Sequence, residues 1–439
     1  MKNPIFLPST EWPVIGEYDV VVVGAGPGGV GAAVGAARLG QRTLIVEKYG
    51  FPGGVAAIAE CPYLMGYAAE GRQIVGGVAD ELVRELDRMG QAGFAAKTSH
   101  TPERRPIVDR PILDNVITSV EAVRIADNRL LERAGVARLY YTSLIGAVVE
   151  KDRLTAVAVD CVEGPGLIRA RCFVDATGDA NLVNRAGGEV REGSVEDTMT
   201  KTLLIRVGGV SHYHCESAKQ RYKQLAQEKK TPFHNQDQLM SLGLLNPGEV
   251  SLNFTLAAGN GLLSSELTRM DIAMREQILI ALDFFRREMP EFVNCYLVDA
   301  ACGVGVRAGR SIVGMDTITQ KDIDDGTPVA EPVALGTRGY GGHGIDSFRQ
   351  SWCKWQKGLR AIPMKTLIPK SFANVTAAGR AISCEVRVVS TFRLMSRCMA
   401  IGQAAGVMAA LAAKSGKAIP DVPYRSVREE LLKQNAILE

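Results

Sequence analysis

The most informative residues of this 439-residue chain are closely spaced glycines followed by an acid. An apolar run at 19–23 leads into Gly-Ala-Gly-Pro-Gly-Gly at 24–29, and a second apolar run ends at Glu47. Glycines at this spacing permit a tight turn and a close approach of backbone to a pyrophosphate, which the following helix N-terminus attracts. The acid accepts hydrogen bonds from ribose hydroxyls and repels a 2′-phosphate. The predicted dinucleotide contacts are Gly24, Gly26, Pro27, Gly28, Gly29, Glu47 and Lys48; the alternative is a tight packing turn without ligand.

Three further side chains could handle a proton or an anion. His343 lies in the sequence Gly-Gly-His-Gly, where a loop would present an imidazole that titrates near neutrality, so we predict a general acid or base. A surface-loop histidine is the alternative. Arg307 and Arg310 could fork onto a substrate carboxylate. Their alternative is an ion-pair network with acids such as Asp316.

The cysteine and histidine spacing indicates neither a redox dithiol nor a metal site. Cys61 follows the glycine pair 53–54, but no second cysteine stands three or five positions away, so a disulfide reductase is not predicted. The segment His-Tyr-His-Cys at 212–215 has no second ligand cluster at recognisable spacing, and a polar surface segment is the simpler interpretation. We therefore predict no metal.

The candidate dinucleotide residues require a parallel α/β framework to position them. The two apolar runs and the small-residue helix between them predict a strand–helix–strand unit. Helices are predicted at 77–89 and 109–134, a further parallel strand at 136–141, and strands with a period of two at 144–150, 154–162 and 167–174. The change of period indicates a three-stranded meander whose last strand runs into Asp-Ala-Thr-Gly-Asp at 175–179.

The second half of the chain begins irregularly and then returns to the style of the first. Its features are a polar stretch at 213–238, a helix at 266–288, a glycine-rich segment at 336–344, a strand at 372–378 and a Gly/Ala-rich helix at 395–413. We predict an α/β fold in which residues 1–192 and 364–439 form a discontinuous Rossmann-like domain, with a parallel sheet and the meander. An α+β substrate or cap domain at 193–363 is inserted into it.

Composition and charge narrow the class of partner. The formal net charge is +3, and the basic residues are spread along the chain, so nucleic-acid binding is not predicted. Residues 1–8 do not have the pattern of a secretory signal, and no uninterrupted apolar segment is long enough to span a bilayer. Nine scattered cysteines indicate reduced thiols. We expect a cytoplasmic protein that acts on a small molecule without a membrane partner; a homo-oligomer stays open.

Four motifs together resemble those of the FAD-dependent oxidoreductases of the glutathione-reductase-like superfamily, nearest to the branch of succinate dehydrogenase and fumarate reductase flavoproteins. The resemblance covers residues 18–188 and 307–411. Besides 24–29 with Glu47, the motifs are Gly53-Gly54, Asp175-Ala176-Thr177-Gly178-Asp179, Asn374 to Arg380, and Gly402-Gln403-Ala404-Ala405-Gly406. The resemblance implies an oxidoreductase enzyme that binds FAD and not NAD.

Each of these motifs has a task in the implied FAD site. The glycines at 53–54 would lie beside the pyrophosphate or the flavin edge, and the turn at 176–178 beside the adenosine half. Arg380 would add a charge-assisted bond to phosphate. The helix at 398–406 would point its N-terminus at the flavin N1/O2 edge; close helix packing is the alternative. The resemblance adds the contacts Gly53, Gly54, Ala176, Thr177, Gly178, Asp179, Gly379, Arg380, Gly402, Gln403 and Ala404.

A narrower resemblance, to bacterial proteins described only as FAD-dependent oxidoreductases, rests on residues 307–314 and 362–369. In that group the second stretch lies near the flavin ring, which implies that Lys365 lies near N1 or O2, or holds a water near N5. A solvated loop lysine is the alternative. Met364 and Lys365 depart from the usual Tyr and Arg, and Val386 stands where the group often carries a histidine.

The resulting functional prediction is hydride transfer between a small organic substrate and flavin N5. A carboxylate on that substrate is an extension from Arg307, Arg310 and Arg338. Two other functions stay open: a tRNA-modifying flavoprotein, against which the lack of a long basic C-terminal domain argues, and a flavin subunit that passes electrons to a partner protein. The sequence does not choose between oxidase and dehydrogenase, or between covalent and non-covalent FAD.

Overall fold

The computed structural model describes residues 11–94, 115–195, 197–233, 238–343 and 350–439. Residues 1–8, and 109–114 of the helix predicted at 109–134, lie outside these ranges. The helices are α1 (Pro27–Ala37), α2 (Val55–Ile58), α3 (Gly77–Arg88), α4 (Val120–Arg133), α5 (Asn181–Arg185), α6 (Cys215–Gln227), α7 (Ser264–Glu288), α8 (Gln320–Asp325), α9 (Met395–Ser415) and α10 (Tyr424–Lys433). The strands are β1 (Val14–Val23), β2 (Thr43–Val46), β3 (Tyr63–Met65), β4 (Ala68–Ala69), β5 (Arg72–Gln73), β6 (Gly93–Phe94), β7 (Asn115–Ile117), β8 (Ala137–Leu139), β9 (Ser143–Glu150), β10 (Arg153–Cys161), β11 (Gly164–Asp175), β12 (Val190–Glu192), β13 (Ile205–Gly208), β14 (Ser241–Gly243), β15 (Val250–Leu252), β16 (Tyr296–Ala300), β17 (Arg310–Ile312), β18 (Pro332–His343), β19 (Gln350–Pro363) and β20 (Val375–Ala377).

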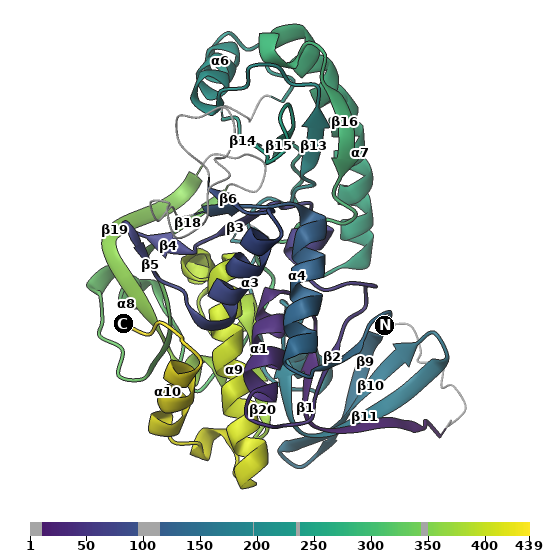
Figure 1. The fold of residues 1–439 in the computed structure, drawn as a ribbon, viewed down its shortest axis with the longest axis vertical. Coiled ribbons are helices and arrows are strands. Elements are labelled where there is room, and N and C mark those ends of the chain that lie inside the picture. Colours follow the sequence, from purple (N-terminus) through teal and green to yellow (C-terminus); the bar gives the residue numbers. More distant parts are fainter. Residues whose placement is uncertain (1–10, 95–114, 196, 234–237, 344–349) are drawn as a thin grey trace.

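A seven-stranded sheet extends to the right in the lower part of Figure 1, with the order β8-β2-β1-β11-β10-β9 and with β20 paired to β11. β8, β2, β1, β11 and β20 are parallel neighbours. Val20 and Val22 face one hydrophobic cluster, which includes α1 and α9, whereas Val21 and Val23 face a second cluster with the meander. Burial on both faces explains why β1 ends in an unbroken apolar run. The predicted mixed α/β fold with a parallel sheet is confirmed.

β11 attaches the meander to the parallel sheet. It pairs antiparallel with β10 from Gly164 to Arg169, and in parallel with β1 through to Asp175. Because Val23 of β1 is paired with Asp175, both strands end at the same sheet edge. The predicted three-stranded meander, and its junction with the turn that follows Asp175, are confirmed.

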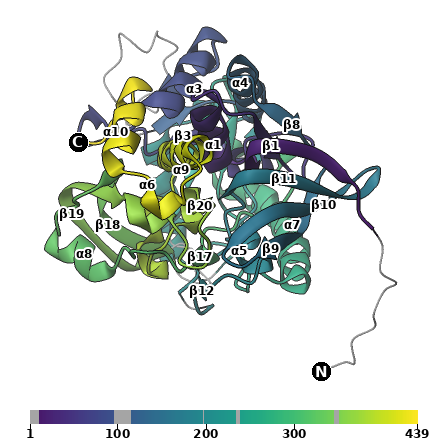
Figure 2. The ribbon, with the colours of Figure 1, turned by 90° about the horizontal axis from the view of Figure 1, so that it is seen from below.

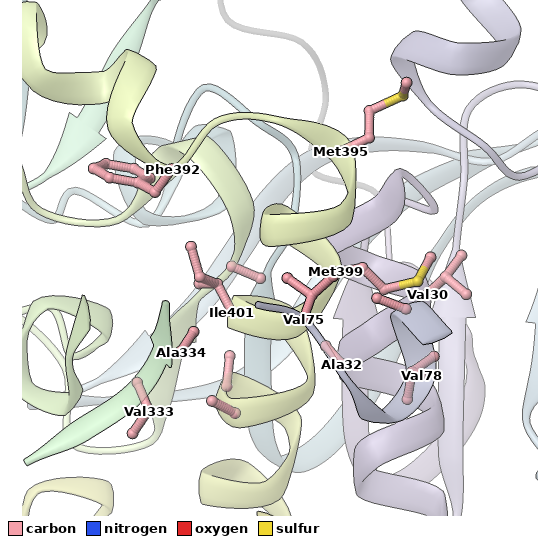
Figure 3. Close-up of a cluster of buried hydrophobic side chains, with 14 of the residues drawn as sticks. Val30, Ala32, Val75, Val78, Val333, Ala334, Phe392, Met395, Met399 and Ile401 are labelled. Atoms are coloured by element: carbon pink, nitrogen blue, oxygen red, sulfur yellow. The ribbon is translucent and has the colours of Figure 1, made fainter. Parts of the chain in front are cut away.

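Helices α1 and α9 lie so close that their backbones almost touch. A Cβ added at Gly402 of α9 would overlap the carbonyl oxygen of Gly28 in α1. Figure 3 shows α9 between the two sides of the core, with Met399 beside Val30 of α1 and Ile401 directed towards β18. Only small side chains allow this approach, which is why both helices are rich in glycine and alanine.

Among the described residues, α9 is the one helix with the length and apolar composition of a membrane span. However, 83% of its apolar window is buried inside the fold. Its hydrophobicity is therefore that of the central core helix.

The upper part of Figure 1 has a core of its own. Four antiparallel strands in the order β14-β15-β13-β16 pack with α6 and α7. Tyr222 of α6 contacts Phe254 and Phe284 edge-on, with ring centroids 5.7 and 5.8 Å apart. By contrast, Val333 of β18 and Leu367 share the hydrophobic cluster of α9. The view from below in Figure 2 shows β18 and β19 on the same side of α9 as α8.

Two predicted elements differ from the structure. The segment 109–134 contains strand β7 before helix α4 begins at Val120, where the Ser119 side chain caps the helix by accepting from the Ala122 N–H. The Gly-Gly-His-Gly sequence at 341–344, predicted as a loop, lies in β18 as far as His343. Pairing with β19 stabilises this strand, as does the hydrogen bond from Thr391 Oγ1 to the Gly339 carbonyl. Local glycine content predicts a loop, but these tertiary contacts favour the strand.

Candidate functional site

A cavity of about 770 Å³ follows the carboxyl ends of the parallel strands. These ends meet at one sheet edge, which is the usual ligand-binding edge of an open α/β sheet. Of the residues predicted as site contacts, the cavity brings together Gly24, Gly26, Pro27, Gly28, Glu47, Lys48, Gly54, Ala176, Thr177, Gly178, Asp179, Arg310, Gly379 and Arg380. The predicted contacts Gly29, Gly53, Arg307, Lys365, Gly402, Gln403 and Ala404 are not part of its lining.

Glu47 occupies one end of the cavity in a fixed orientation. Its Oε2 accepts a hydrogen bond from the Ala25 N–H at 2.7 Å, and its Oε1 accepts one from the Tyr49 N–H at 3.1 Å. A carboxylate has about four acceptor sites, so it can still accept from ribose hydroxyls. Beside it, the Lys48 ammonium lies 4.8 Å from the centre of the Tyr49 ring. This end of the cavity suits a nucleoside.

The middle of the cavity is the N-terminus of α1. Gly26 is the N-cap residue and Pro27 occupies the first turn, where its missing N–H costs no hydrogen bond. The loop residue Gly54 has a φ of +49°, and a Cβ there would lie 2.6 Å from the Gly26 Cα. Gly53 contributes structure and not a free donor, because its N–H is donated to the Ala25 carbonyl at 2.9 Å. The loop and the helix terminus thus form a backbone-lined position for an anion.

Arg380 requires a correction of its predicted role. Its Nη2 donates to both carboxylate oxygens of Asp179 at 2.8 Å, its Nε to the Gly178 carbonyl at 2.8 Å and its Nη1 to the Val306 carbonyl at 2.6 Å. The protein itself therefore satisfies most donors that the sequence assigned to phosphate. Arg380 instead joins the turn after β11, the turn after β20 and the segment before β17.

The motif Gly402-Gln403-Ala404 also lies elsewhere than predicted. Gly402 packs on Gly28 and Ala404 is fully buried. The Gln403 side chain accepts from the Val78 N–H at 3.1 Å and donates to Gln434 Oε1 at 3.2 Å, so it joins α9 to α3 and α10. The packing alternative describes this motif. It is the first turn of α9, with Met395 and Cys398, that lines the cavity.

Three predicted cationic contacts pair with other parts of the protein. Arg310 lines the cavity, but its Nε donates to Glu192 at 2.7 Å, so the ion-pair alternative holds with a different acid from Asp316. Lys365 is half exposed, and its Nζ lies 3.8 Å from Glu331, so the solvated-lysine alternative describes it. Arg338 donates to the carbonyls of α8 residues 323 and 324 at 3.1 and 2.8 Å.

His343 is the last residue of β18 and not part of a free loop. Its side chain lies outside the described part of the structure. The predicted acid or base role therefore stays a prediction.

Arg307 belongs to a group of buried cations that the sequence did not reveal. Its Nη1 donates to the Thr200 carbonyl at 2.6 Å, and burial lowers its pKa to about 10. Lys201 is 1% exposed and donates to Thr198 Oγ1 at 2.9 Å. Burial, and then the charge of Arg307, lower the Lys201 pKa to about 8.

Arg393, two residues before α9, completes this group and lines the cavity. Burial and then the charges of Arg307 and Arg380 lower its pKa to about 9. Lys201, Arg307 and Arg393 are distant in sequence and share no motif. Only the uncharged surroundings of Lys201 between Thr198 and Leu204 hint that this lysine is buried.

The thiol and metal interpretations gain no support. Burial raises the pKa of Cys61 to about 11, so it is not a reactive thiolate at neutral pH. His214 of the segment 212–215 caps α6 by accepting from the Ser217 N–H at 3.3 Å. Within the described ranges, no group of three or more His, Cys, Asp or Glu side chains could hold a metal ion.

Comparisons with known proteins identify relatives of the chain. Residues 19–431 match the family model described as FAD dependent oxidoreductase. Thiamine thiazole synthase of Saccharolobus islandicus strain L.S.2.15 is 29% identical over 199 residues, which are 42% of this chain and 63% of that protein. Dihydrolipoyl dehydrogenase of Trypanosoma brucei brucei is 52% identical over 50 residues, 11% of this chain and 10% of that protein. The chain thus spans less than two thirds of both curated relatives.

A solved structure with a similar fold is the myxobacterial chondrochloren halogenase CndH, a variant of FAD-dependent halogenases. The TM-score is 0.50 at 15% sequence identity, and the alignment covers 95% of this chain and 79% of that chain. At this identity the likeness concerns the fold alone.

Proposed function

The chain belongs to the FAD dependent oxidoreductase family, and from that membership we propose that this FAD-dependent enzyme transfers a hydride between a carbon of a small organic substrate and flavin N5. The observation that carries the proposal is the continuous cavity, which extends from Glu47 past the N-terminus of α1 to Arg393 and the first turn of α9. Bound FAD supplies the hydride chemistry, so the protein has to bind, orient and move a proton.

The lining residues fit FAD from one end of the cavity to the other. The fixed carboxylate of Glu47 suits the adenosine ribose, and the N-terminus of α1 suits the pyrophosphate. Met395 and Cys398 offer an apolar wall for the flavin ring, beside the N-terminus of α9. These are this chain's own residues in an order that matches nucleotide, pyrophosphate and ring.

Towards the substrate, our proposal gives Arg307 the role of binding a carboxylate or supplying a proton, and His343 that of general acid or base. The burial of Arg307 beside Lys201 and Arg393 supports the role proposed for it. Arg310 and Lys365 have no part in this proposal, because Arg310 pairs with Glu192 and Lys365 is a half-exposed side chain beside Glu331.

The proposal includes narrower statements on family and organisation. We place the chain near the succinate dehydrogenase and fumarate reductase branch of the glutathione-reductase-like superfamily. We assign FAD binding to residues 1–192 and 364–439 and the cap to 193–363, which the separate aromatic core of the upper strands and helices supports. We propose a cytoplasmic location and a small-molecule substrate, without a nucleic-acid or membrane partner.

The test is a visible absorption spectrum of the purified protein before and after acid precipitation. Flavin bands released into the supernatant establish non-covalent FAD, whereas bands that stay with the pellet indicate a covalent link. Hydroxy acids, amino acids and sugars are then added anaerobically. Bleaching by one class identifies the hydride donor.

Flavin bands that no compound bleaches would argue against the substrate oxidoreductase and favour the electron-transfer subunit. A protein that takes up no FAD would contradict the whole proposal.

A further inference from the structure

Lys201, Arg307 and Arg393 come from three segments that hydrogen bonds hold together. The Gly305 N–H donates to the Thr202 carbonyl at 2.8 Å, and Arg307 donates to the Thr200 carbonyl, so the segments 200–202 and 305–307 run side by side. Arg393 lines the large cavity directly. The site therefore adjoins the α9 end of the cavity, where our proposed function places the flavin ring.

Lys201 is tied to the cavity wall as well. A Cβ placed on Gly261, a residue of the lining, would be in contact with the Lys201 Cε at 3.5 Å and would crowd the Val306 side chain at 2.9 Å. Val306 lines the cavity and also accepts a hydrogen bond from Arg380. The three cations thus lie around one corner of the cavity.

The positive charge at this corner is not balanced by the protein. Within the described residues, none of Lys201, Arg307 and Arg393 forms an ion pair with a carboxylate. The carboxylate that attracts Lys201 is Asp179, and both of its oxygens already accept from Arg380. Buried charges without a counterion are costly, and proteins rarely keep them unless a ligand completes the site.

Arg393 also has an unused donor. Its Nε is buried and has no hydrogen-bond partner in the described structure, and its Nη2 reaches only the Met199 sulfur, at 3.6 Å. A sulfur acceptor is weak, so the guanidinium is left poorly satisfied. An arginine beside a cavity with such unsatisfied donors is suited to bind an oxyanion.

We propose that Lys201, Arg307 and Arg393 form an oxyanion site that binds a carboxylate group of the substrate beside the flavin ring. The two planar guanidinium forks match the two oxygens of a carboxylate, and the ammonium adds a third charged donor. This inference rests on the proposed function only in one respect, the placement of the flavin ring next to the oxyanion site. The anion chemistry itself follows from these three side chains.

The test is binding of acetate, oxalate and succinate to the FAD-loaded protein, measured by isothermal titration calorimetry and by perturbation of the flavin spectrum. We expect Lys201→Met and Arg393→Gln each to weaken binding of these carboxylates by tenfold or more. Arg307→Lys, which keeps the charge but loses the fork, should weaken it less than Arg307→Gln. Arg287→Gln, which removes an exposed arginine on α7, is the matched control and should bind as wild type does.

Equal carboxylate affinity in wild type and in all the site variants would overturn the assignment, as would a holoenzyme that binds no carboxylate. Sulfate or inorganic phosphate binding more tightly than every carboxylate would also overturn it. Because flavin content is measured separately, loss of FAD contradicts the proposed function, whereas FAD retained without carboxylate binding contradicts only this site. Circular dichroism of each variant establishes that it is folded.

Discussion

The two ends of the large cavity differ in whether the protein itself pairs their charged side chains. At the nucleoside end, Glu47 accepts from two backbone N–H groups, and in the turn after β11 Asp179 and Arg380 satisfy each other. At the other end, Arg307 and Arg393 are buried without a carboxylate partner among the described residues. The difference teaches that the protein alone organises the nucleoside end, whereas the end beside α9 has positive charge left for a ligand.

The same contrast holds for packing. In the lower core, α1 and α9 touch through glycine and alanine backbone, so there is no room for another methyl group at Gly402. In the upper part, aromatic side chains such as Phe254 and Phe285 fill the core, with ring centroids 4.9 Å apart. A core filled by side chains can repack, but a contact between two backbones cannot.

The largest expected effect comes from a substitution that breaks the backbone contact between α1 and α9. Gly402→Val would drive a side chain into the Gly28 carbonyl, and we expect a loss of about 4 kcal/mol or more in unfolding free energy, with loss of FAD binding. Urea unfolding and flavin content measure both. Lys414→Ala, on the exposed end of the same helix, is the control. A stable, yellow Gly402→Val protein would show that the contact is not required.

The second prediction concerns Asp127 on α4. Unlike Glu47 and Asp179, this buried acid has no hydrogen-bond partner for its carboxyl group in the described structure. It is 1% exposed, and it borders a cavity of about 10 Å³. Burial raises its pKa to about 8. The folded state therefore holds a proton that the unfolded chain releases above pH 4, and wild-type stability falls as pH rises from 4 to 8.

Asp127→Asn removes this dependence. We expect the variant to gain about 3 kcal/mol over wild type at pH 8 and nearly nothing at pH 4, measured by urea unfolding across that range. A difference that is the same at every pH would show that the buried carboxyl is not responsible.

The third prediction concerns Glu47, whose orientation at the nucleoside end of the cavity is fixed by hydrogen bonds within the protein. Glu47→Gln keeps the shape of the side chain but loses the negative charge that accepts from Ala25 and Tyr49. We expect FAD affinity to fall about tenfold, or about 1.4 kcal/mol, in a fluorescence titration of the apoprotein. Glu132→Gln, on the exposed end of α4, should leave the affinity unchanged. Unchanged affinity in Glu47→Gln would remove this carboxylate from the site.

The smallest expected effect concerns the stability of the protein without ligand, and it comes from a substitution in the group of buried cations beside α9. Lys201→Met removes a buried charge that faces Arg307 and Arg380, with Asp179 as its one attracting acid, so we expect a gain of about 1 kcal/mol in unfolding free energy at pH 7. The folded-state pKa of about 8 lies below the usual value for lysine. Wild type therefore recovers stability as pH rises through 8 towards 10, and the gap should close there. A variant less stable than wild type at pH 7 would contradict the comparison.

Local patterns predicted the parts of the fold whose causes are local. The alternating strands of the meander and the turn from β1 into α1 follow from side-chain periodicity and from glycine spacing, and they are present. The loop predicted around His343 was wrong for residues 341–343, because their pairing with β19 outweighs the local glycine content. Lys365 was assigned to the flavin by resemblance, but its position after β19 places it outside the cavity lining.

The sequence alone determined the class of cofactor site, because an acid and a glycine turn at fixed spacing bind a nucleotide through backbone and carboxylate atoms that adjacent elements position. It did not determine which charges stay unpaired. Arg380 pairs with Asp179 about 200 positions away, whereas Lys201 and Arg393 form no ion pair with a carboxylate among the described residues. Pairing depends on distances between segments remote in sequence, and only the tertiary structure decides those distances.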